Sequence, residues 1–172
     1  MLANLGKPAA PEDAVALLLE CHGRIRSFLD LARRLGAAQD VPADVVAEAA
    51  VRVHRYFSLA LPLHARDEEE SVLPRIAGRE PGLDRELEAM RREHAEHQEP
   101  LRRLLGASVV LASSPSRLTD LAPAFAEAAR DLSRHFEVHL AREESVIFPA
   151  VRRLLGPAAD AEIVAELRAR RT

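Results

Sequence analysis

The sequence has very little cysteine and very few aromatic side chains. Its 172 residues include one cysteine, Cys21, no tryptophan, and only 3% aromatic residues in total. A single cysteine cannot form a disulfide within the chain, so cross-linking contributes nothing to the fold. Apolar residues nonetheless make up 48% of the chain, with much alanine and leucine beside arginine and glutamate. This composition favours helices over sheets and suffices for the hydrophobic core of one domain.

The sequence also lacks a long apolar run and an excess of charge of one sign. No stretch approaches the roughly 20 apolar residues that a membrane-spanning helix needs. The 24 basic and 27 acidic residues are interspersed, without the basic stripe typical of proteins that bind nucleic acid or an anionic membrane. The N-terminal MLANLGKPAAPED is too short and too polar for a signal peptide. We therefore expect a cytoplasmic protein whose partners include neither nucleic acid nor a membrane.

Turn-forming residues divide the chain into four long segments with a helical spacing of apolar residues. The expected helices span 12–36, 43–77, 83–112 and 117–155, and a short tail helix follows at 158–170. Short connections between long helices predict an all-α fold: an antiparallel up-down-up-down four-helix bundle with a short C-terminal extra helix. We expect a single domain over 1–172, with the bundle core at 12–155.

Prolines mark one start and two irregularities in these helices. Pro11, followed by Glu12 and Asp13, is typical of the first turn of a helix. Pro62 lies inside the second helix and should kink it near 59–61, because proline lacks the backbone N–H that the helix needs. Pro100 lies inside the third helix in the same way.

One phrase occurs twice. HARDEEESVLP at 64–74 and HLAREESVIFP at 139–149 each contain a histidine, a carboxylate cluster and, ten residues after the histidine, a proline. A helix with its own histidine precedes each copy, with His22 lying 42 residues before the first and His94 lying 45 before the second. The chain therefore resembles two helical hairpins of one design. Packed about a pseudo-two-fold axis, they would bring four histidines toward the middle of the bundle.

Each copy places a histidine and a glutamate on one face of a helix. His64 and Glu68 are four residues apart, as are His139 and Glu143, so each pair lies on one side about a turn apart. Imidazole and carboxylate together suit iron, zinc and related cations. Without a metal, glutamates on a core-facing stripe would carry a large desolvation cost. A single such pair is common as helix support, but two copies with the same proline spacing favour metal binding.

A ferritin-like site is excluded by the spacing. That architecture uses Glu-x-x-His pairs, and no histidine of this sequence has a glutamate three residues before it.

The combined pattern resembles the hemerythrin-like, or HHE cation-binding, family. The stretches YFSLALPLHARDEEESVLP and HFEVHLAREESVIFP are similar to that family's second and fourth helices, and the resemblance extends from about residue 12 to 155. It implies a four-helix bundle around a non-haem di-iron centre. The metal ligands that it implies are four terminal histidines, His22, His64, His94 and His139, and two bridging glutamates, Glu68 and Glu143. It does not tell which histidine binds which metal.

The sequence departs from the family pattern on its third helix. An oxygen-carrying hemerythrin has an H-x-x-x-H pair there, whereas this chain has Gln98 at the second position and a histidine at His97. His97 is thus a candidate fifth ligand. His135, one turn before the histidine of the second copy, is an equal candidate, either as a ligand or as a partner that orients that histidine. His54 is expected to be structural or exposed.

The first copy of the phrase leaves the identity of its bridging glutamate open. Alignment on the proline pairs Glu68 with Glu143, whereas alignment on Glu-Ser-Val pairs Glu69 with Glu143. Glu68 is preferred, because a residue five after His64 points about 140° away on a straight helix. Glu69 and Glu144 are then exposed acids or outer partners of the site.

Three functions fit such a site. The first is binding or sensing of a small ligand, namely dioxygen, nitric oxide or iron itself. The second is a di-iron enzyme of the oxidase, peroxidase or nitric-oxide and iron–sulfur repair type, for which peroxide is a further candidate partner. The third is a redox-inert bundle stabilised by zinc or manganese. The tail helix, with apolar Ile163, Val164 and Leu167 on one side, is expected to dock either on the bundle or on a second copy in a homodimer.

Overall fold

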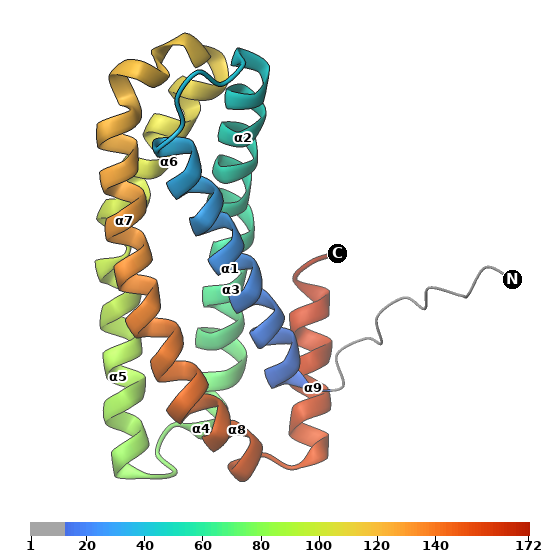
Figure 1. The fold of residues 1–172 in the computed structure, drawn as a ribbon. Helices are drawn as coiled ribbons and strands as arrows, with labels where there is room; N and C mark the ends of the chain where they lie inside the picture. The colour runs from blue at the N-terminus through green and yellow to red at the C-terminus, as the bar shows by residue number, and fades with distance from the viewer. Residues whose placement is uncertain (1–12) are drawn as a thin grey trace, which may run out of the picture.

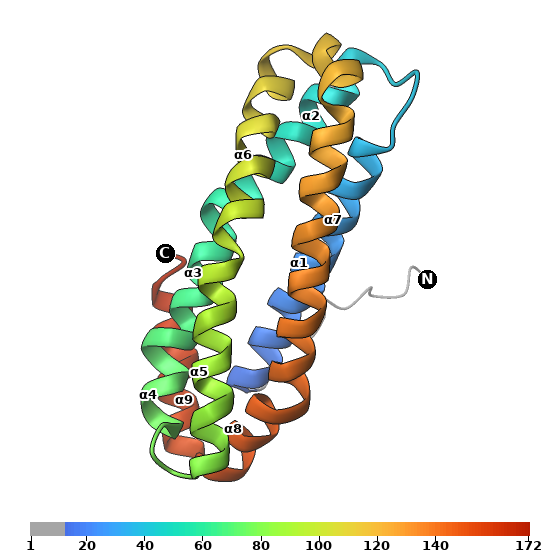
Figure 2. The same ribbon diagram turned by 90° about the vertical axis from the view of Figure 1, so that its left-hand side faces the viewer.

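The computed structural model describes residues 13–172, and every regular element in this range is helical (Figures 1 and 2). No strand is found between these residues, which confirms the prediction of an all-helical fold. Residues 1–12 lie outside the described part, and with them the helix start expected at Pro11 and Glu12 and the polar N-terminal stretch. Within 13–172, no helix combines the length and the apolar character needed to cross a membrane.

Four long helical columns lie side by side, and all but the first consist of several consecutive elements (Figure 1). The first column is one helix, α1 (Ala14–Gly36). The second comprises α2 (Ala43–Arg55), η1 (Tyr56–Ala60), α3 (Leu61–Arg66), η2 (Asp67–Val72) and α4 (Leu73–Ile76). The third comprises α5 (Pro81–Glu96) and α6 (Gln98–Ser113). The fourth comprises η3 (Pro115–Arg117), α7 (Leu118–Arg142), η4 (Glu143–Ile147) and α8 (Phe148–Leu154), and α9 (Pro157–Ala169) follows it.

Prolines widen the second and fourth columns instead of ending them. The segments η1, η2 and η4 are π-helical turns, and each lies just ahead of a proline: Pro62, Pro74 or Pro149. In a regular helix the proline ring would clash with the carbonyl four residues earlier, and a wider turn avoids that clash. The kink expected near 59–61 is therefore a π-helical turn in a continuous helix.

The third column is interrupted where a single helix was expected. The segment predicted at 83–112 divides at His97 into α5 and α6. Pro100 explains the break, because it has no N–H to donate to the carbonyl of Glu96. The backbone bonds on either side, from His97 N to Glu93 O and from Leu101 N to His97 O, are both 3.0 Å long.

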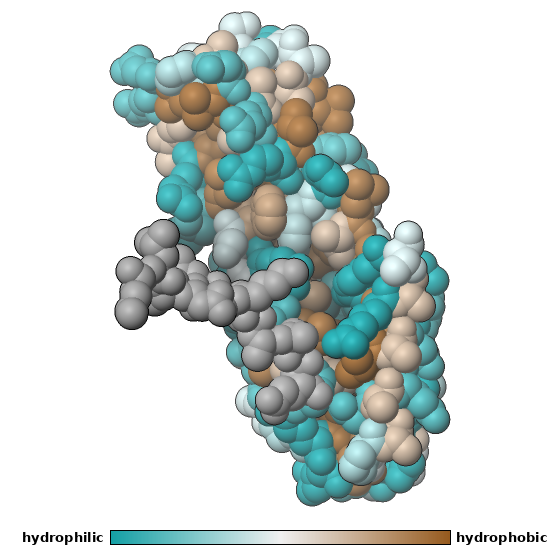
Figure 3. All heavy atoms as spheres, turned by 90° about the vertical axis from the view of Figure 1, so that its right-hand side faces the viewer, coloured by the Kyte–Doolittle hydropathy of each residue, from teal (hydrophilic) through white to brown (hydrophobic). Residues whose placement is uncertain are grey.

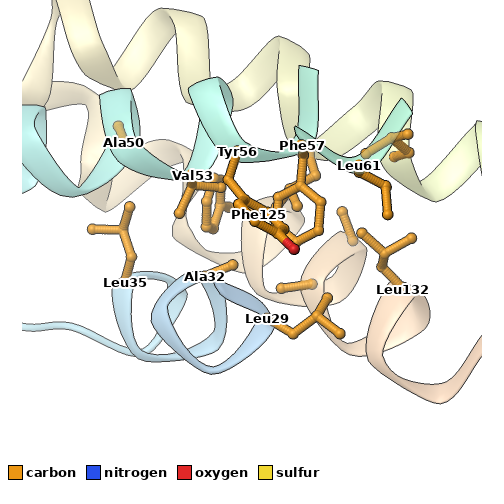
Figure 4. Close-up of a cluster of buried hydrophobic side chains, with 14 of the residues drawn as sticks. Leu29, Ala32, Leu35, Ala50, Val53, Tyr56, Phe57, Leu61, Phe125 and Leu132 are labelled. Atoms are coloured by element: carbon orange, nitrogen blue, oxygen red, sulfur yellow. The ribbon is translucent and has the colours of Figure 1, made fainter. Parts of the chain in front are cut away.

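Apolar faces of the columns pack together into two separate clusters. Around one end of the bundle, aromatic and aliphatic side chains from the second column meet α1 and α7 (Figure 4). Tyr56 lies flat on Phe28, with 4.1 Å between the ring centroids. A second cluster joins Leu18, Leu73, Met90 and Phe148 at the other end. Burial of these two clusters is the main force that holds the helices together.

One close approach fixes the end of α1. A Cβ atom added at Gly36 would lie only 2.8 Å from the Cα atom of Ala126 in α7. Only glycine allows the two helices to come this close.

The tail helix docks on the bundle. Ile163 and Leu167 of α9 are buried, and α9 packs against α1 and η2. On the face of the molecule that carries α9, hydrophilic side chains are interspersed with apolar ones (Figure 3). Of the two expected positions for this helix, the structure thus shows the one on its own bundle.

Candidate metal centre

A layer of ionisable side chains separates the two apolar clusters. On α1, His22 lies between Leu18 of one cluster and Ile25 of the other. His64 of α3 and His139 of α7 lie at the same boundary on their own columns. All three histidines are buried, and so are Glu68 at η2 and Glu143 at η4. Charged and polar groups at such a position need partners, because burial removes them from water.

Four of these side chains form a first group of potential metal ligands. His22, His64, Glu68 and Glu143 each offer one atom within 4.8 Å of the others. His22 Nε2 lies 3.0 Å from Glu143 Oε2, and His64 Nε2 lies 3.2 Å from Glu68 Oε1.

A second group contains the same two glutamates and two other histidines. Glu68, His94, His139 and Glu143 also offer atoms that lie within 4.8 Å of one another. His139 Nε2 lies 3.1 Å from Glu143 Oε1, and His94 Nε2 lies 3.5 Å from Glu68 Oε2. Each glutamate therefore directs one oxygen to the first pair of histidines and its other oxygen to the second pair. This is the arrangement of carboxylates that bridge two cations.

Most of the close atoms form no hydrogen bond; the exception is the 3.2 Å contact between His94 Nε2 and His139 Nε2. His22 Nε2, both nitrogens of His64 and all four oxygens of Glu68 and Glu143 are buried without a hydrogen-bond partner anywhere in 13–172. These atoms surround two common points at short distance, but their directions are not those of donors and acceptors. Nitrogen and oxygen ligands of this kind suit iron, zinc and manganese. The residues present therefore fit two metal ions.

Carboxylates outside the two groups hold three of the histidine rings. The Nδ1 atoms of His22, His94 and His139 lie 2.8, 2.7 and 3.0 Å from carboxylate oxygens. Their respective partners are Glu144, Glu69 and Glu93. A carboxylate on Nδ1 assigns the ring proton to that nitrogen and leaves Nε2 free to bind a metal. The structure thus places Glu69 and Glu144 on the outside of the site, against ring nitrogens.

Arginines fix two of these outer carboxylates. Arg26 lies 2.8 Å from Glu144, and Arg142 lies 3.0 Å from Glu93. His22 and His139 are therefore each oriented by a carboxylate that an arginine in turn holds in place. Sequence reasoning missed Glu93 and both arginines, because these contacts join residues on different columns and no spacing in the sequence indicates them.

The π-helical turns explain the proline that ends each copy of the phrase. Leu73 N–H donates to the carbonyl of Glu68, and Phe148 N–H donates to that of Glu143, each five residues back. In a regular helix these N–H groups would bond to the carbonyls of Glu69 and Glu144. Both turns therefore begin at or next to the glutamate of the site. Such single π-helical turns are frequent at functional sites.

The pKa shifts follow from burial and from the contacts between the two glutamates and the histidines. Burial, with Glu143 nearby, raises the pKa of Glu68 well above its ordinary value. Burial alone would also raise the pKa of Glu143, but its contacts with His139 and His22 hold it below the usual range. Burial lowers the pKa of His64 to about 3. In the metal-free protein the two carboxylates thus cannot both keep their charge easily, whereas cations would compensate both.

The additional histidines lie beside the two groups. His97 is buried, stacks on Phe136 with 4.3 Å between ring centroids, and meets His139 edge-on at 4.9 Å. It offers no atom to either group of four. His135 is half-buried and lies edge-on to His97 at 5.8 Å. His54 lies farther along, in a groove between α2 and α6.

A cavity of about 350 Å³ opens against one side of the site. Histidines of the second group line it, together with His64 and His97, and apolar Leu61, Leu101 and Phe136 form much of its wall. Glu69 and Gln98 also line it. His22 does not, so the second group faces the cavity more openly than the first. Two other cavities, of about 670 and 690 Å³, lie away from the site; among the residues that line them is one histidine, His54.

Helical columns that enclose a layer of histidines and shared carboxylates are typical of a class of metal-binding bundle. The model of the hemerythrin HHE cation-binding domain matches residues 13–151, and the chain belongs to this family. The family resemblance drawn from the repeated phrase is thereby confirmed. Membership implies binding of a metal cation, in agreement with the two groups of ligands.

The chain is also similar to mycobacterial proteins without an assigned function. The uncharacterized proteins Mb2018 of Mycobacterium bovis and Rv1995 of Mycobacterium tuberculosis are each 31% identical to it over 152 residues. The similar region covers 83% of this chain and 53% of each relative. The chain therefore spans about half the length of the curated relatives it matches.

Proposed function

We propose that this protein holds two iron ions inside an up-down-up-down four-helix bundle and binds a small ligand such as dioxygen or nitric oxide. One observation carries the proposal: each of Glu68 and Glu143 divides its two oxygens between two pairs of histidines. His22 and His64 would hold one ion, and His94 and His139 the other. Imidazole and carboxylate ligands suit iron in particular among the redox-active metals of helical bundles.

The arrangement of the chain leaves room for a ligand. Six protein side chains do not fill the coordination positions of two iron ions, and when bound the irons would supply exchangeable positions and a change of oxidation state. The cavity beside the second group provides a route from the surface. Its apolar wall of Leu61, Leu101 and Phe136 disfavours water and anions, and so favours a small neutral ligand.

A second candidate function is favoured by the size of this cavity. Pockets that bind organic ligands start at about 300 Å³, and the cavity here, at about 350 Å³, lies just above this limit. A diatomic molecule needs far less space. The cavity therefore has room for an organic substrate, and a di-iron oxidase or peroxidase that acts on such a substrate stands beside reversible ligand binding as the second candidate.

The test begins with anaerobic loading by ferrous iron, followed by measurement of the metal content and of the optical spectrum on exposure to air or nitric oxide. The proposal expects about two irons per chain and new charge-transfer bands of a ferric pair or of a nitric oxide adduct. Failure to retain iron, or retention of zinc without any spectral change, would overturn it. Consumption of peroxide far beyond one equivalent per chain would favour the enzyme over the binding protein.

A further inference from the structure

Asp67 is a buried carboxylate that the metal centre does not use. It precedes Glu68 in the sequence and is completely buried, yet neither group of four ligands contains it. Two arginines occupy its oxygens. Arg170 lies 2.9 Å from Oδ1, and Arg171 contacts Oδ2. Both arginines directly follow α9, about 100 residues farther along the chain.

The same two arginines contact the surroundings of two metal ligands. Arg170 also donates to the hydroxyl of Ser71 at 2.7 Å, so it binds both Asp67 and a residue one turn later in η2. Arg171 donates to Cys21 Sγ at 3.8 Å. Asp67 and Cys21 are the direct sequence neighbours of the ligands Glu68 and His22. The end of the tail helix thus holds two segments that carry parts of the site.

The contact of Asp67 with the two arginines differs from the other ion pairs of the tail helix because Asp67 is buried. Arg75 joins α4 to α9 through Glu166 at 2.7 Å and Glu162 at 3.3 Å, but these carboxylates are substantially exposed. Exposed pairs of this kind contribute little to stability. An unpaired carboxylate at the position of Asp67 would instead leave a buried charge uncompensated, which is strongly destabilising. Undocking the two arginines is therefore strongly unfavourable as long as Asp67 is charged.

The segment held in this way is one that needs support. A π-helical turn is rare and mostly limited to a single turn within a regular helix. In η2 this turn sets the position of Glu68, one of the two glutamates that direct oxygens to both histidine pairs. At η4 the carboxylate next to the site's glutamate is Glu144, which is partly exposed and binds a single arginine, Arg26, instead of a pair. The two halves of the site are therefore supported differently.

We propose that Arg170 and Arg171 act as positioning residues: with Asp67 they form a latch by which the tail helix holds η2 and Glu68 in the geometry that retains the metals. The proposal rests on the proposed metal-binding function and assigns to α9 a role in it. The latch controls how quickly metal leaves the site. Its loss leaves the ligands present but less firmly placed, so metal release becomes faster.

The test compares variants of the full chain loaded with ferrous iron. Replacing only the arginines would strand a buried charge, so the informative variant is the triple Asp67→Asn/Arg170→Gln/Arg171→Gln, which removes charge on both sides. Arg75→Gln is the matched control, because it also weakens the docking of α9 but leaves Asp67 paired. Two quantities are measured: the rate of iron release to an excess of chelator, and hydrogen exchange of the amides in 67–73.

The latch predicts that the triple variant releases iron about 10- to 100-fold faster than wild type, the usual effect of losing an outer partner of a metal site. Amide exchange should accelerate in 67–73, whereas Arg75→Gln should remain within about twofold of wild type in release rate. Arg170→Lys/Arg171→Lys keeps the charges without the planar fork and should give an intermediate rate.

Two results would overturn the latch while leaving the metal centre intact. One is a triple variant that loads iron and releases it at the wild-type rate. The other is a control Arg75→Gln that releases iron as fast as the triple variant, since docking of α9 alone would then explain the effect. A wild-type chain that takes up no iron would overturn the proposed function itself, and the latch with it.

Discussion

His94 and His139 face each other with their Nε2 atoms 3.2 Å apart. Each ring has a carboxylate on its Nδ1 atom, Glu69 for the first and Glu93 for the second. With the ring protons on Nδ1, two bare lone pairs point at each other, which is unfavourable unless a cation lies near both. In the metal-free protein a proton shared by the two Nε2 atoms can take the place of that cation. Burial would lower the pKa of His139, but its contact with Glu143 raises it overall.

Replacement of Glu68 should remove one or both metal ions, whereas replacement of its neighbour Glu69 should not. Glu68→Gln removes a buried carboxylate that faces both histidine pairs, so we expect iron content to fall from about two per chain to one or none. Glu69→Gln leaves this carboxylate in place and removes only the charged partner of His94 Nδ1, so it should still load about two irons when iron is in excess, with a lower affinity. Metal analysis after gel filtration measures both. Equal losses in the two variants would contradict the assignment of the bridging position to Glu68.

Removal of the carboxylate behind His139 should weaken the site without destroying it. Glu93 binds Nδ1 of this ring and is itself held by Arg142. Glu93→Gln keeps a hydrogen-bond acceptor but loses the charge, and we expect metal affinity to fall about 10- to 100-fold. Competition with a chelator of known affinity measures this change. Glu96→Gln, an exposed residue three positions farther on α5, is the control and should leave affinity unchanged.

Pro149, which ends the second copy of the repeated phrase, should matter more for metal binding than Pro62, although a π-helical turn precedes both. Pro149→Ala restores an N–H and permits a regular helix, which would rotate Glu143 away from its place. We expect reduced metal affinity with little change in helix content by circular dichroism. Pro62→Ala acts on η1, whose buried side chains are Tyr56 and Phe57. It should alter thermal stability but largely retain the metals, and a greater metal loss here than in Pro149→Ala would contradict the idea.

Acid should destabilise the metal-free protein partly through His97. Burial, with His139 and other imidazoles nearby, lowers its pKa from 6.5 to about 3. Between these two values the unfolded chain binds a proton that the folded chain does not, so this share of stability is complete above pH 6.5 and is lost as pH falls toward 3. The substitution His97→Phe removes this pH-dependent share of stability and keeps an aromatic ring against Phe136.

Chemical denaturation at several pH values measures the effect. Relative to wild type, the unfolding free energy of His97→Phe should improve as pH falls through this window, by up to about 1.4 kcal/mol per pH unit. Parallel pH profiles of the two proteins would show that His97 is not held neutral by its surroundings.

The sequence by itself determined the helices and the set of candidate ligands. Apolar spacing predicted a second helix over 43–77 and the structure has it over 43–76, because burial of one face dictates a helical period. The repeated phrase indicated four potential ligands, and the histidine of the helix before each copy, together with the family resemblance, completed the set of six. The structure brings all six side chains together at the boundary between the two apolar clusters. Local spacing sufficed for the two histidine–glutamate pairs, since residues four apart share a face of any helix.

Only the tertiary structure decided how these side chains are held. The position of His97 beside the ligand groups depends on the helix break before Pro100. The partners of the site, such as Glu93 for His139 and Arg171 for Asp67, come from columns far apart in the chain. Contacts of this kind follow from the rotation and depth of each packed helix, and these are set by the whole core rather than by any local pattern. For this reason the candidate ligands can be predicted from the sequence, whereas the residues that hold them in place are known only from the tertiary structure.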